Sequence, residues 1–190
     1  SFLQENNLTE KISQNEMKIL QKYWKGEGSE INWYHELFNN LGKDGVLDFF
    51  QDCIQSDFQL YKDYIKSGPH LDIGSGSGIC PLYIRKNKDI NVLCLDIYEG
   101  DLTDEVKLAI ENDTKFSFAY YKAGTDFPFE SNEMQSASLF YVLHHCQNEG
   151  EVIQLLKETH RVLIDDGLLI VTEEPASDEG HRERKKKIDI

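Results

Sequence analysis

Three glycines at alternate positions, Gly74, Gly76 and Gly78, directly follow a short apolar segment. A glycine-rich turn between a strand and a helix lets backbone N–H groups approach a ligand, because side chains would block the approach. A second apolar segment, residues 90–95, is followed by Asp96, which stands 18 positions after Gly78. An acid at the tip of the neighbouring strand can accept hydrogen bonds from both hydroxyls of a ribose. The spacing therefore predicts a nucleotide-like ligand held between the turn and Asp96.

Two common phosphate-binding loops are excluded by the residues around the glycines. No Gly-Lys-Ser or Gly-Lys-Thr follows them, so the turn is not a P-loop. Ile79 stands where the dinucleotide fingerprint G-x-G-x-x-G requires its third glycine.

The elements that must position these residues begin at His70, where the pattern becomes an alternation of strands and helices, as in a parallel sheet. The predicted strands are 70–73, 91–96, 115–121, 136–142 and 168–173, and the predicted helices are 79–87, 102–112 and 149–163. Residues 165–167 form the predicted turn into the last strand. Residues 1–68 follow helical periodicity, so we divide the chain into a helical segment, 1–68, and an α/β domain, 69–190, within one compact unit.

Composition restricts the partners. The 190 residues carry a net charge of −14, which disfavours nonspecific binding to a phosphate backbone. The one basic run, residues 182–187, is interpreted as a solvated end, with a local contact to an anionic partner as the alternative.

Location and metal binding are judged from the apolar runs and the cysteines. No run approaches the length of about 20 residues that a membrane span needs, and we expect no signal peptide. The four cysteines lie in apolar segments without C-x-x-C spacing, which favours reduced, buried thiols over disulfides or zinc. We therefore expect a cytoplasmic protein with no metal site.

The stretch LDIGSGSG at residues 71–78, with Asp96 downstream, resembles motif I of the class I S-adenosylmethionine (SAM) methyltransferases. Residues 139–145 resemble the family's "VLHH" strand end, residues 126–129 its "D-L-P-F" element, and residues 161–167 its "R-V-L-K-P-G-G" turn. The resemblance extends over residues 68–174 and implies SAM as cofactor, bound to a Rossmann-like, mostly parallel sheet.

The resemblance also implies residue roles. The glycines would pass under the methionine part of SAM, Asp72 would help hold its amino group, Asp96 would bind the ribose, and Ile97 would pack on the adenine. The predicted cofactor-binding set is Asp72, Gly74, Ser75, Gly76, Gly78, Asp96, Ile97, Gly124, Thr125 and Tyr141.

His144 and His145 stand at the end of the predicted fourth strand, where ligands bind in open α/β sheets. One of them is a candidate general base for an amine or hydroxyl acceptor. The alternative is a structural histidine hydrogen-bonded to the backbone. Methyl transfer from a sulfonium depends mainly on positioning, so a catalytic residue is not required.

In related enzymes the segment before the sheet folds over SAM as a lid, which is the role we predict for residues 1–68. Trp24 lies in this segment, and Trp33 and Tyr34 are predicted to line the substrate entrance, with packing of an amphipathic helix as the alternative.

The predicted function is transfer of a methyl group from SAM to a nitrogen or oxygen of a small molecule or protein. A catalytically silent SAM-fold binding or partner subunit is the alternative, because Ala123 and Gln135 stand where the family often has acids. A methyltransferase acting on RNA, such as a cap enzyme, is a weaker alternative.

Only about 17 residues follow the fifth predicted strand, too few for the antiparallel hairpin that completes the family's sheet. We therefore expect the edge of that strand to be covered by a second copy, a partner subunit or further carboxyl-terminal residues.

Overall fold

The computed structural model describes residues 54–97 and 102–173. The chain divides into two compact units, one of residues 1–56 with 175–190 and one of residues 57–174. Nearly all described residues belong to the second unit. Most of the predicted lid, including Trp24, Trp33 and Tyr34, lies outside the described residues, so its role stays a prediction.

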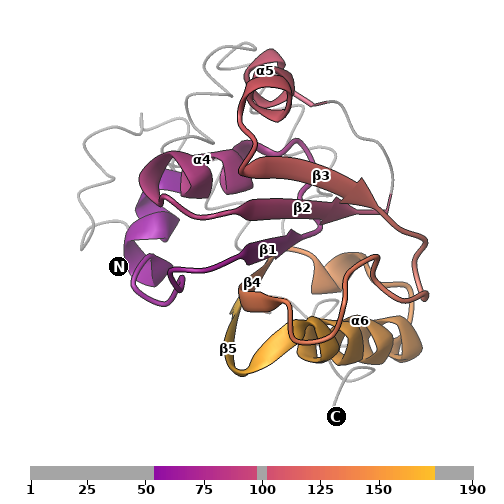
Figure 1. The fold of residues 1–190 in the computed structure, drawn as a ribbon. Helices are drawn as coiled ribbons and strands as arrows, with labels where there is room; N and C mark the ends of the chain where they lie inside the picture. The colour runs from indigo at the N-terminus through magenta and orange to yellow at the C-terminus, as the bar shows by residue number, and fades with distance from the viewer. Residues whose placement is uncertain (1–53, 98–101, 174–190) are drawn as a thin grey trace, which may run out of the picture. The chain divides into compact units, whose positions relative to one another are not determined.

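The described unit contains a five-stranded sheet in the order β3-β2-β1-β4-β5, and every neighbouring pair is parallel. Its strands are β1 (His70–Ile73), β2 (Val92–Asp96), β3 (Phe116–Tyr120), β4 (Met134–Phe140) and β5 (Leu163–Thr172). Figure 1 shows them side by side, with β3 and β5 at the two edges. The prediction of a Rossmann-like parallel sheet is confirmed.

Three helices connect the strands: α4 (Ile79–Asn87), α5 (Asp104–Asn112) and α6 (Glu149–Val162). Thr103 and Asn148 cap α5 and α6, because their side-chain oxygens accept from the N–H groups of Val106 and Glu151. Residues 54–61 are also helical, and the short 3-10 helix η2 (Leu143–His145) follows β4.

Each face of the sheet packs into its own hydrophobic cluster. On one face, Phe58 and Tyr61 pack with Leu82 and Ile84 of α4 and Val106 of α5. On the other face, Leu155 and Val162 of α6 pack with inward-facing residues of β1, β2 and β4. Packing of α4 and α5 on one face and of α6 on the other thus buries the sheet and fixes the positions of its strand ends.

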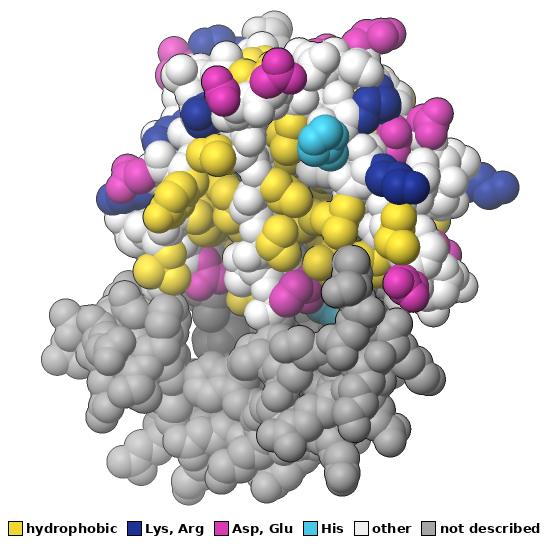
Figure 2. Space-filling model, turned by 90° about the horizontal axis from the view of Figure 1, so that it is seen from below, with side chains coloured by type: hydrophobic (Ala, Val, Ile, Leu, Met, Phe, Trp, Pro, Cys, Tyr) yellow, Lys and Arg dark blue, Asp and Glu magenta, His cyan; other side chains and the backbone are white. Residues whose placement is uncertain are grey.

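The fifth strand is irregular and lies at an edge of the described sheet. Met134 pairs with Leu163 and Ser136 with Leu168, so residues 164–167, which include the predicted turn, bulge out of the ladder. Leu168 and Val171 are 37% and 46% exposed. Figure 2, seen from below, shows hydrophobic side chains gathered on one face of the described unit. What covers this edge stays a prediction.

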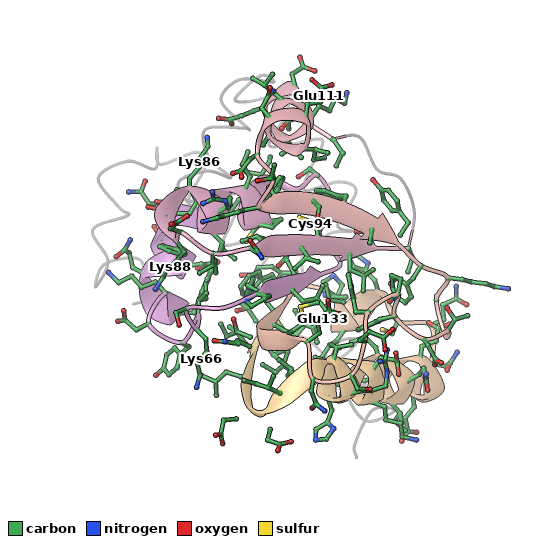
Figure 3. The ribbon with its side chains drawn as sticks, in the orientation of Figure 1. Lys66, Lys86, Lys88, Cys94, Glu111 and Glu133 are labelled. Atoms are coloured by element: carbon green, nitrogen blue, oxygen red, sulfur yellow. The ribbon has the colours of Figure 1, made fainter. Side chains whose placement is uncertain are left out.

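Cys80, Cys94 and Cys146 are free thiols. Cys94 lies inside the sheet, as Figure 3 shows, and burial raises the pKa of its thiol. Cys80 and Cys146 are only partly buried, so among the described cysteines the expectation of a buried thiol holds fully for Cys94 alone, and the reduced state stays a prediction. No helix in residues 54–97 and 102–173 has the length and apolar character to span a membrane.

Candidate functional site

The carboxyl ends of β1, β2 and β4 meet around a cavity of about 210 Å³. Open parallel sheets bind their ligands at this edge, where the chain connections diverge. Eight of the twelve residues predicted for cofactor binding or catalysis line the cavity: Gly74, Gly76, Asp96, Ile97, Gly124, Thr125, Tyr141 and His145. Asp72, Ser75, Gly78 and His144 are not lining residues. The structure therefore brings most of the predicted site together.

The three glycines of the turn all have positive φ angles, which other residues adopt only with strain. A Cβ at Gly74 would lie 2.5 Å from Val142 Cγ2, and one at Gly78 would lie 2.8 Å from Phe118 Cζ. A Cβ at Gly76 would meet nothing within 4 Å. The outer glycines are therefore required by packing, whereas the middle one leaves its backbone open toward the cavity.

Asp96 ends β2 and is only 7% exposed. Its Oδ2 accepts from the N–H of Gly76 and its Oδ1 from the N–H of Ile97, both at 2.7 Å. A carboxylate offers about four lone-pair directions, so each oxygen retains acceptor capacity toward the cavity. Ser75 holds the turn against β2, because its Oγ accepts from the N–H of Leu95 and donates to the carbonyl of Asp72. The Asp96 carboxylate can therefore accept from two adjacent hydroxyls of a ligand that lies beside the backbone of Gly76.

Asp72 belongs to a buried polar chain that joins β1 to β4. Ser138 Oγ donates to Asp72 Oδ1 at 2.6 Å, and the two nitrogens of His70 lie 3.0 Å from Ser138 Oγ and 2.8 Å from Ser136 Oγ. Burial raises the pKa of Asp72 to about 6, although the bond from Ser138 opposes the shift. Burial lowers the pKa of His70 to about 3, so its ring is neutral. The predicted contact of Asp72 with the cofactor stays a prediction.

The chain leaves β4 at Tyr141, which has a φ of +58°. The predicted strand end at residue 142 is therefore wrong by two residues, since β4 ends at Phe140. A left-handed tyrosine is strained and persists only where its surroundings hold it. Here its N–H donates to Thr172 O at 2.8 Å, and its side chain is hydrogen-bonded to Asp57. Burial raises the pKa of Asp57, although that bond opposes the shift.

The two histidines have different environments. His145 lines the cavity, whereas His144 Nδ1 lies 2.9 Å from Glu173 Oε2. Their ring centroids are 4.0 Å apart. The alternative to a general base was a structural histidine that is hydrogen-bonded to the backbone. The observed partner of His144 is instead the carboxylate of Glu173. A catalytic role for either histidine stays a prediction.

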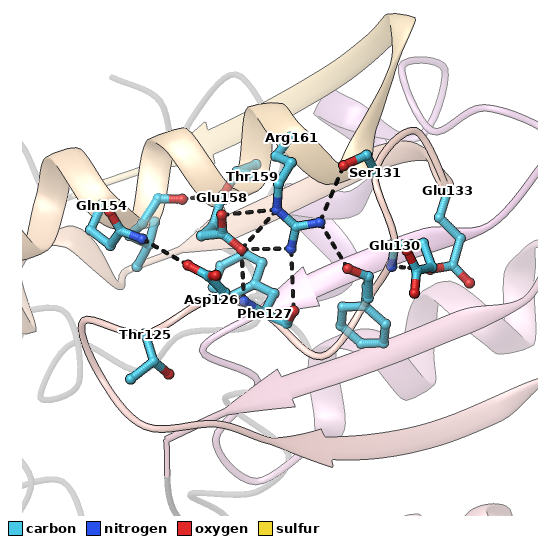
Figure 4. A network of polar contacts seen from close by, with 12 residues as sticks. Thr125, Asp126, Phe127, Glu130, Ser131, Glu133, Gln154, Glu158, Thr159 and Arg161 are labelled. Atoms are coloured by element: carbon cyan, nitrogen blue, oxygen red, sulfur yellow. Dashed lines mark hydrogen bonds and ion pairs between the residues drawn. The ribbon is translucent and has the colours of Figure 1, made fainter.

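A polar network around Arg161 fixes the loop that forms another wall of the cavity (Figure 4). The guanidinium donates to both carboxylate oxygens of Glu158 and to the carbonyls of Phe127 and Phe129. Glu158 in turn accepts from the N–H of Phe127 at 2.7 Å, and the bond from Arg161 lowers its pKa. Arg161 thereby fixes Phe127 in the cavity wall.

Several lining residues were not predicted. Glu151, Gln154 and Leu155 lie on one face of α6 at helical spacing, and that spacing was the available signal. Tyr121 lines the same cavity, and burial raises the pKa of its phenol to about 12. The remaining lining residues are Ile73, Ala123, Phe127, Val142 and Cys146.

The family described as "Methyltransferase domain" matches residues 71–171, more than half of the chain. The chain belongs to this family. The resemblance to SAM-dependent methyltransferases is thereby confirmed, and SAM is the cofactor of the family. Gly76 and Asp96 fit it, because they offer open backbone and spare acceptor capacity at the cavity.

Solved structures share the fold. PH0226 from Pyrococcus horikoshii OT3 matches 85% of this chain and 69% of its own at 20% identity, with a TM-score of 0.60. An S-adenosyl-L-methionine-dependent methyltransferase from Methanococcus maripaludis matches 74% and 62% at 17% identity, with a TM-score of 0.54.

Geranyl diphosphate C-methyltransferase from Streptomyces coelicolor A3(2), solved with S-adenosyl-L-homocysteine, matches 62% of this chain and 45% of its own at 14% identity, with a TM-score of 0.51. The chain thus spans less than two thirds of the methanococcal and Streptomyces proteins. Comparison with curated proteins gives no match.

Proposed function

We propose that this chain binds SAM in the cavity at the ends of β1, β2 and β4 and transfers its methyl group to a nitrogen or oxygen of a small molecule or protein. The observation that carries the proposal is the position of Asp96, whose carboxylate faces the glycine turn at the cavity. In the proposed complex it accepts from both ribose hydroxyls, and Ile97 packs on the adenine.

SAM supplies a methyl group that is already activated on a sulfonium, so the protein acts mainly by orienting the reactants and excluding water. The open backbone at Gly76 receives the methionine part, and the backbone at Gly124 and Thr125 receives the adenine edge. A Cβ at Gly124 would meet nothing within 4 Å, which leaves room for this contact.

The charge of the cavity favours an acceptor without phosphates. Among the described residues that line it, the acids are Asp96 and Glu151, and no lysine or arginine is present. Such a wall attracts a sulfonium or an amine and repels a phosphate backbone. This argues against RNA as the acceptor.

A second candidate is a SAM-binding subunit without transferase activity. Ala123 favours it, because this residue lines the cavity where related enzymes often have an acid that accepts from the adenine amino group. The two candidates differ in turnover: release of S-adenosylhomocysteine in the presence of amine or hydroxyl acceptors supports transfer. SAM binding without any such release over a broad acceptor panel supports the silent subunit.

Isothermal titration calorimetry with SAM tests the proposal. Asp96→Ala should weaken binding about tenfold or more, because each hydrogen bond to a carboxylate contributes roughly 1.5–3 kcal/mol. Asp166→Ala removes an exposed acid in the β5 bulge and is the matched control, with unchanged affinity expected. Wild-type affinity in a folded Asp96→Ala protein would refute the assignment.

A further inference from the structure

Glu173 follows β5 directly and makes three contacts with the turn that ends β4. Its Oε1 accepts from the N–H of Val142 at 2.9 Å and from the N–H of Leu143 at 2.6 Å. Its Oε2 lies 2.9 Å from His144 Nδ1. One carboxylate thus binds three successive residues of the turn, about thirty positions earlier in the chain.

The turn has the geometry of an anion-binding nest. Tyr141 is left-handed and Val142 is right-handed, with a φ of −110° and a ψ of −42°. Successive residues of opposite hand direct their N–H groups into one concavity that binds an anion. The carboxylate of Glu173 occupies it, and the N–H of Tyr141 is satisfied by Thr172 O. The N–H groups of Tyr141, Val142 and Leu143 therefore all donate to acceptors of Thr172 and Glu173, at the end of β5.

The same turn forms part of the cavity wall through Tyr141, Val142 and His145. Val142 also packs against Gly74, where a Cβ would lie 2.5 Å from its Cγ2. A shift of the turn would therefore change both the wall and the glycine turn. Because Glu173 holds the turn, its carboxylate controls a part of the cavity that it does not line.

We propose that Glu173 is a positioning residue that fixes residues 141–145 in the cavity wall and keeps a proton on Nδ1 of His144. The effect on SAM binding rests on the proposed function, whereas the effect on the histidine proton does not.

The proton position follows from the acceptor chemistry of the carboxylate. Burial is the largest single effect on Glu173 and acts to raise its pKa. The bonds from His144 and from the N–H groups of Leu143 and Val142 together outweigh it, so the pKa of Glu173 is lowered. An ionised carboxylate only accepts, so Nδ1 of His144 must donate. In the neutral ring the lone pair is then on Nε2, the nitrogen that can take a proton, as in histidines oriented by an acid.

Two substitutions separate the two roles. In Glu173→Gln the amide oxygen can still accept from both N–H groups, but its NH₂ group faces Nδ1, so the ring proton should move to Nε2. In Glu173→Ala the nest loses its acceptor and the turn relaxes. Glu111→Gln on α5, labelled in Figure 3, is the matched control at an acid in another part of the unit.

The first experiment is two-dimensional ¹H–¹⁵N NMR of the histidine rings in the full chain, with His144 assigned through His144→Asn. We expect a proton on Nδ1 in the wild type and in Glu111→Gln, and the Nε2–H tautomer in Glu173→Gln. A wild-type ring protonated on Nε2 alone, or an unchanged tautomer in Glu173→Gln, would overturn the proposal. This result requires no SAM.

The second experiment is SAM binding by calorimetry. Glu173→Ala should bind at least about tenfold more weakly, whereas Glu173→Gln should remain within about threefold of the wild type. A folded Glu173→Ala protein with wild-type affinity contradicts the role in the wall. If the wild type itself binds no SAM, the proposed function fails, and the NMR result still decides whether Glu173 positions His144.

Discussion

Replacing Asp72 by asparagine should raise the unfolding free energy relative to that of the wild type progressively as the pH rises from acid to neutral. Burial raises the pKa of Asp72 from 3.8 to about 6 in the folded protein. The folded state therefore keeps this proton up to about pH 6, whereas the unfolded chain releases it near pH 3.8. The stabilisation that proton binding provides is present below pH 3.8 and is lost as the pH rises through 6.

A shift of this size corresponds to about 3 kcal/mol, since one pKa unit is worth about 1.4 kcal/mol. Asparagine does not titrate, so the variant avoids the loss, and its oxygen can still accept from Ser138. His70 has a lowered pKa, and its effect has the opposite sign, but it is present in both proteins and cancels in the difference.

Urea unfolding of both proteins at several pH values measures the effect. The unfolding free energy of Asp72→Asn minus that of the wild type should rise by about 3 kcal/mol between pH 4 and 7. Any constant penalty from the buried amide shifts the whole curve without changing its slope. A difference that stays flat from pH 4 to 7 would refute the argument that burial controls this carboxyl.

Gly78→Ala should lower the unfolding free energy more than Gly76→Ala. A Cβ at position 78 would lie 2.8 Å from Phe118 Cζ, whereas one at position 76 would meet nothing within 4 Å. Equal losses in urea unfolding would contradict this packing argument. Gly76→Ala should instead weaken SAM binding in calorimetry, and unchanged affinity would place the ligand elsewhere. Ser138→Ala should cost about 1–3 kcal/mol in urea unfolding, because it removes the bond that Ser138 donates to the buried carboxyl of Asp72, and a neutral result would argue against the buried chain. Arg161→Lys should cost about 1–2 kcal/mol, because an ammonium cannot reproduce the planar set of bonds to a carboxylate and two carbonyls, whereas wild-type stability would show that the network is dispensable.

The sheet and most of the cavity were predictable from the sequence. Apolar runs bounded by glycine and acidic residues fix β1 and β2, and the carboxyl ends of parallel strands necessarily meet at one edge. The alternate glycines and Asp96 were therefore placed together by spacing alone. The helix caps were equally local signals, since Thr103 and Asn148 precede acid-rich first turns.

The turn after β4 was not predictable in the same way. Residues 139–142 continue an apolar pattern, which predicts a strand up to residue 142, yet Tyr141 turns into the left-handed region. The contacts that hold it come from Thr172 and Glu173, about thirty residues later. Periodicity reports local preference and contains no information about such a partner.

The buried chain through Asp72 shows the same limit. The resemblance predicts that this acid helps hold the cofactor, which stays a prediction. What the sequence did not reveal is its donor Ser138, which lies 66 positions away and pairs with it through the register of β1 with β4. Similarly, the contribution of α6 to the cavity depends on how the helix packs over the sheet. Its apolar face was visible in the sequence, but its exposure to the site was not.

The most direct test of the central claim is a crystal structure of the full chain with S-adenosylhomocysteine. We expect both ribose hydroxyls within hydrogen-bond distance of the Asp96 carboxylate, with the amino-acid part of the ligand against Gly74 and Gly76. A ligand bound elsewhere, or a ribose that makes no contact with Asp96, would contradict it.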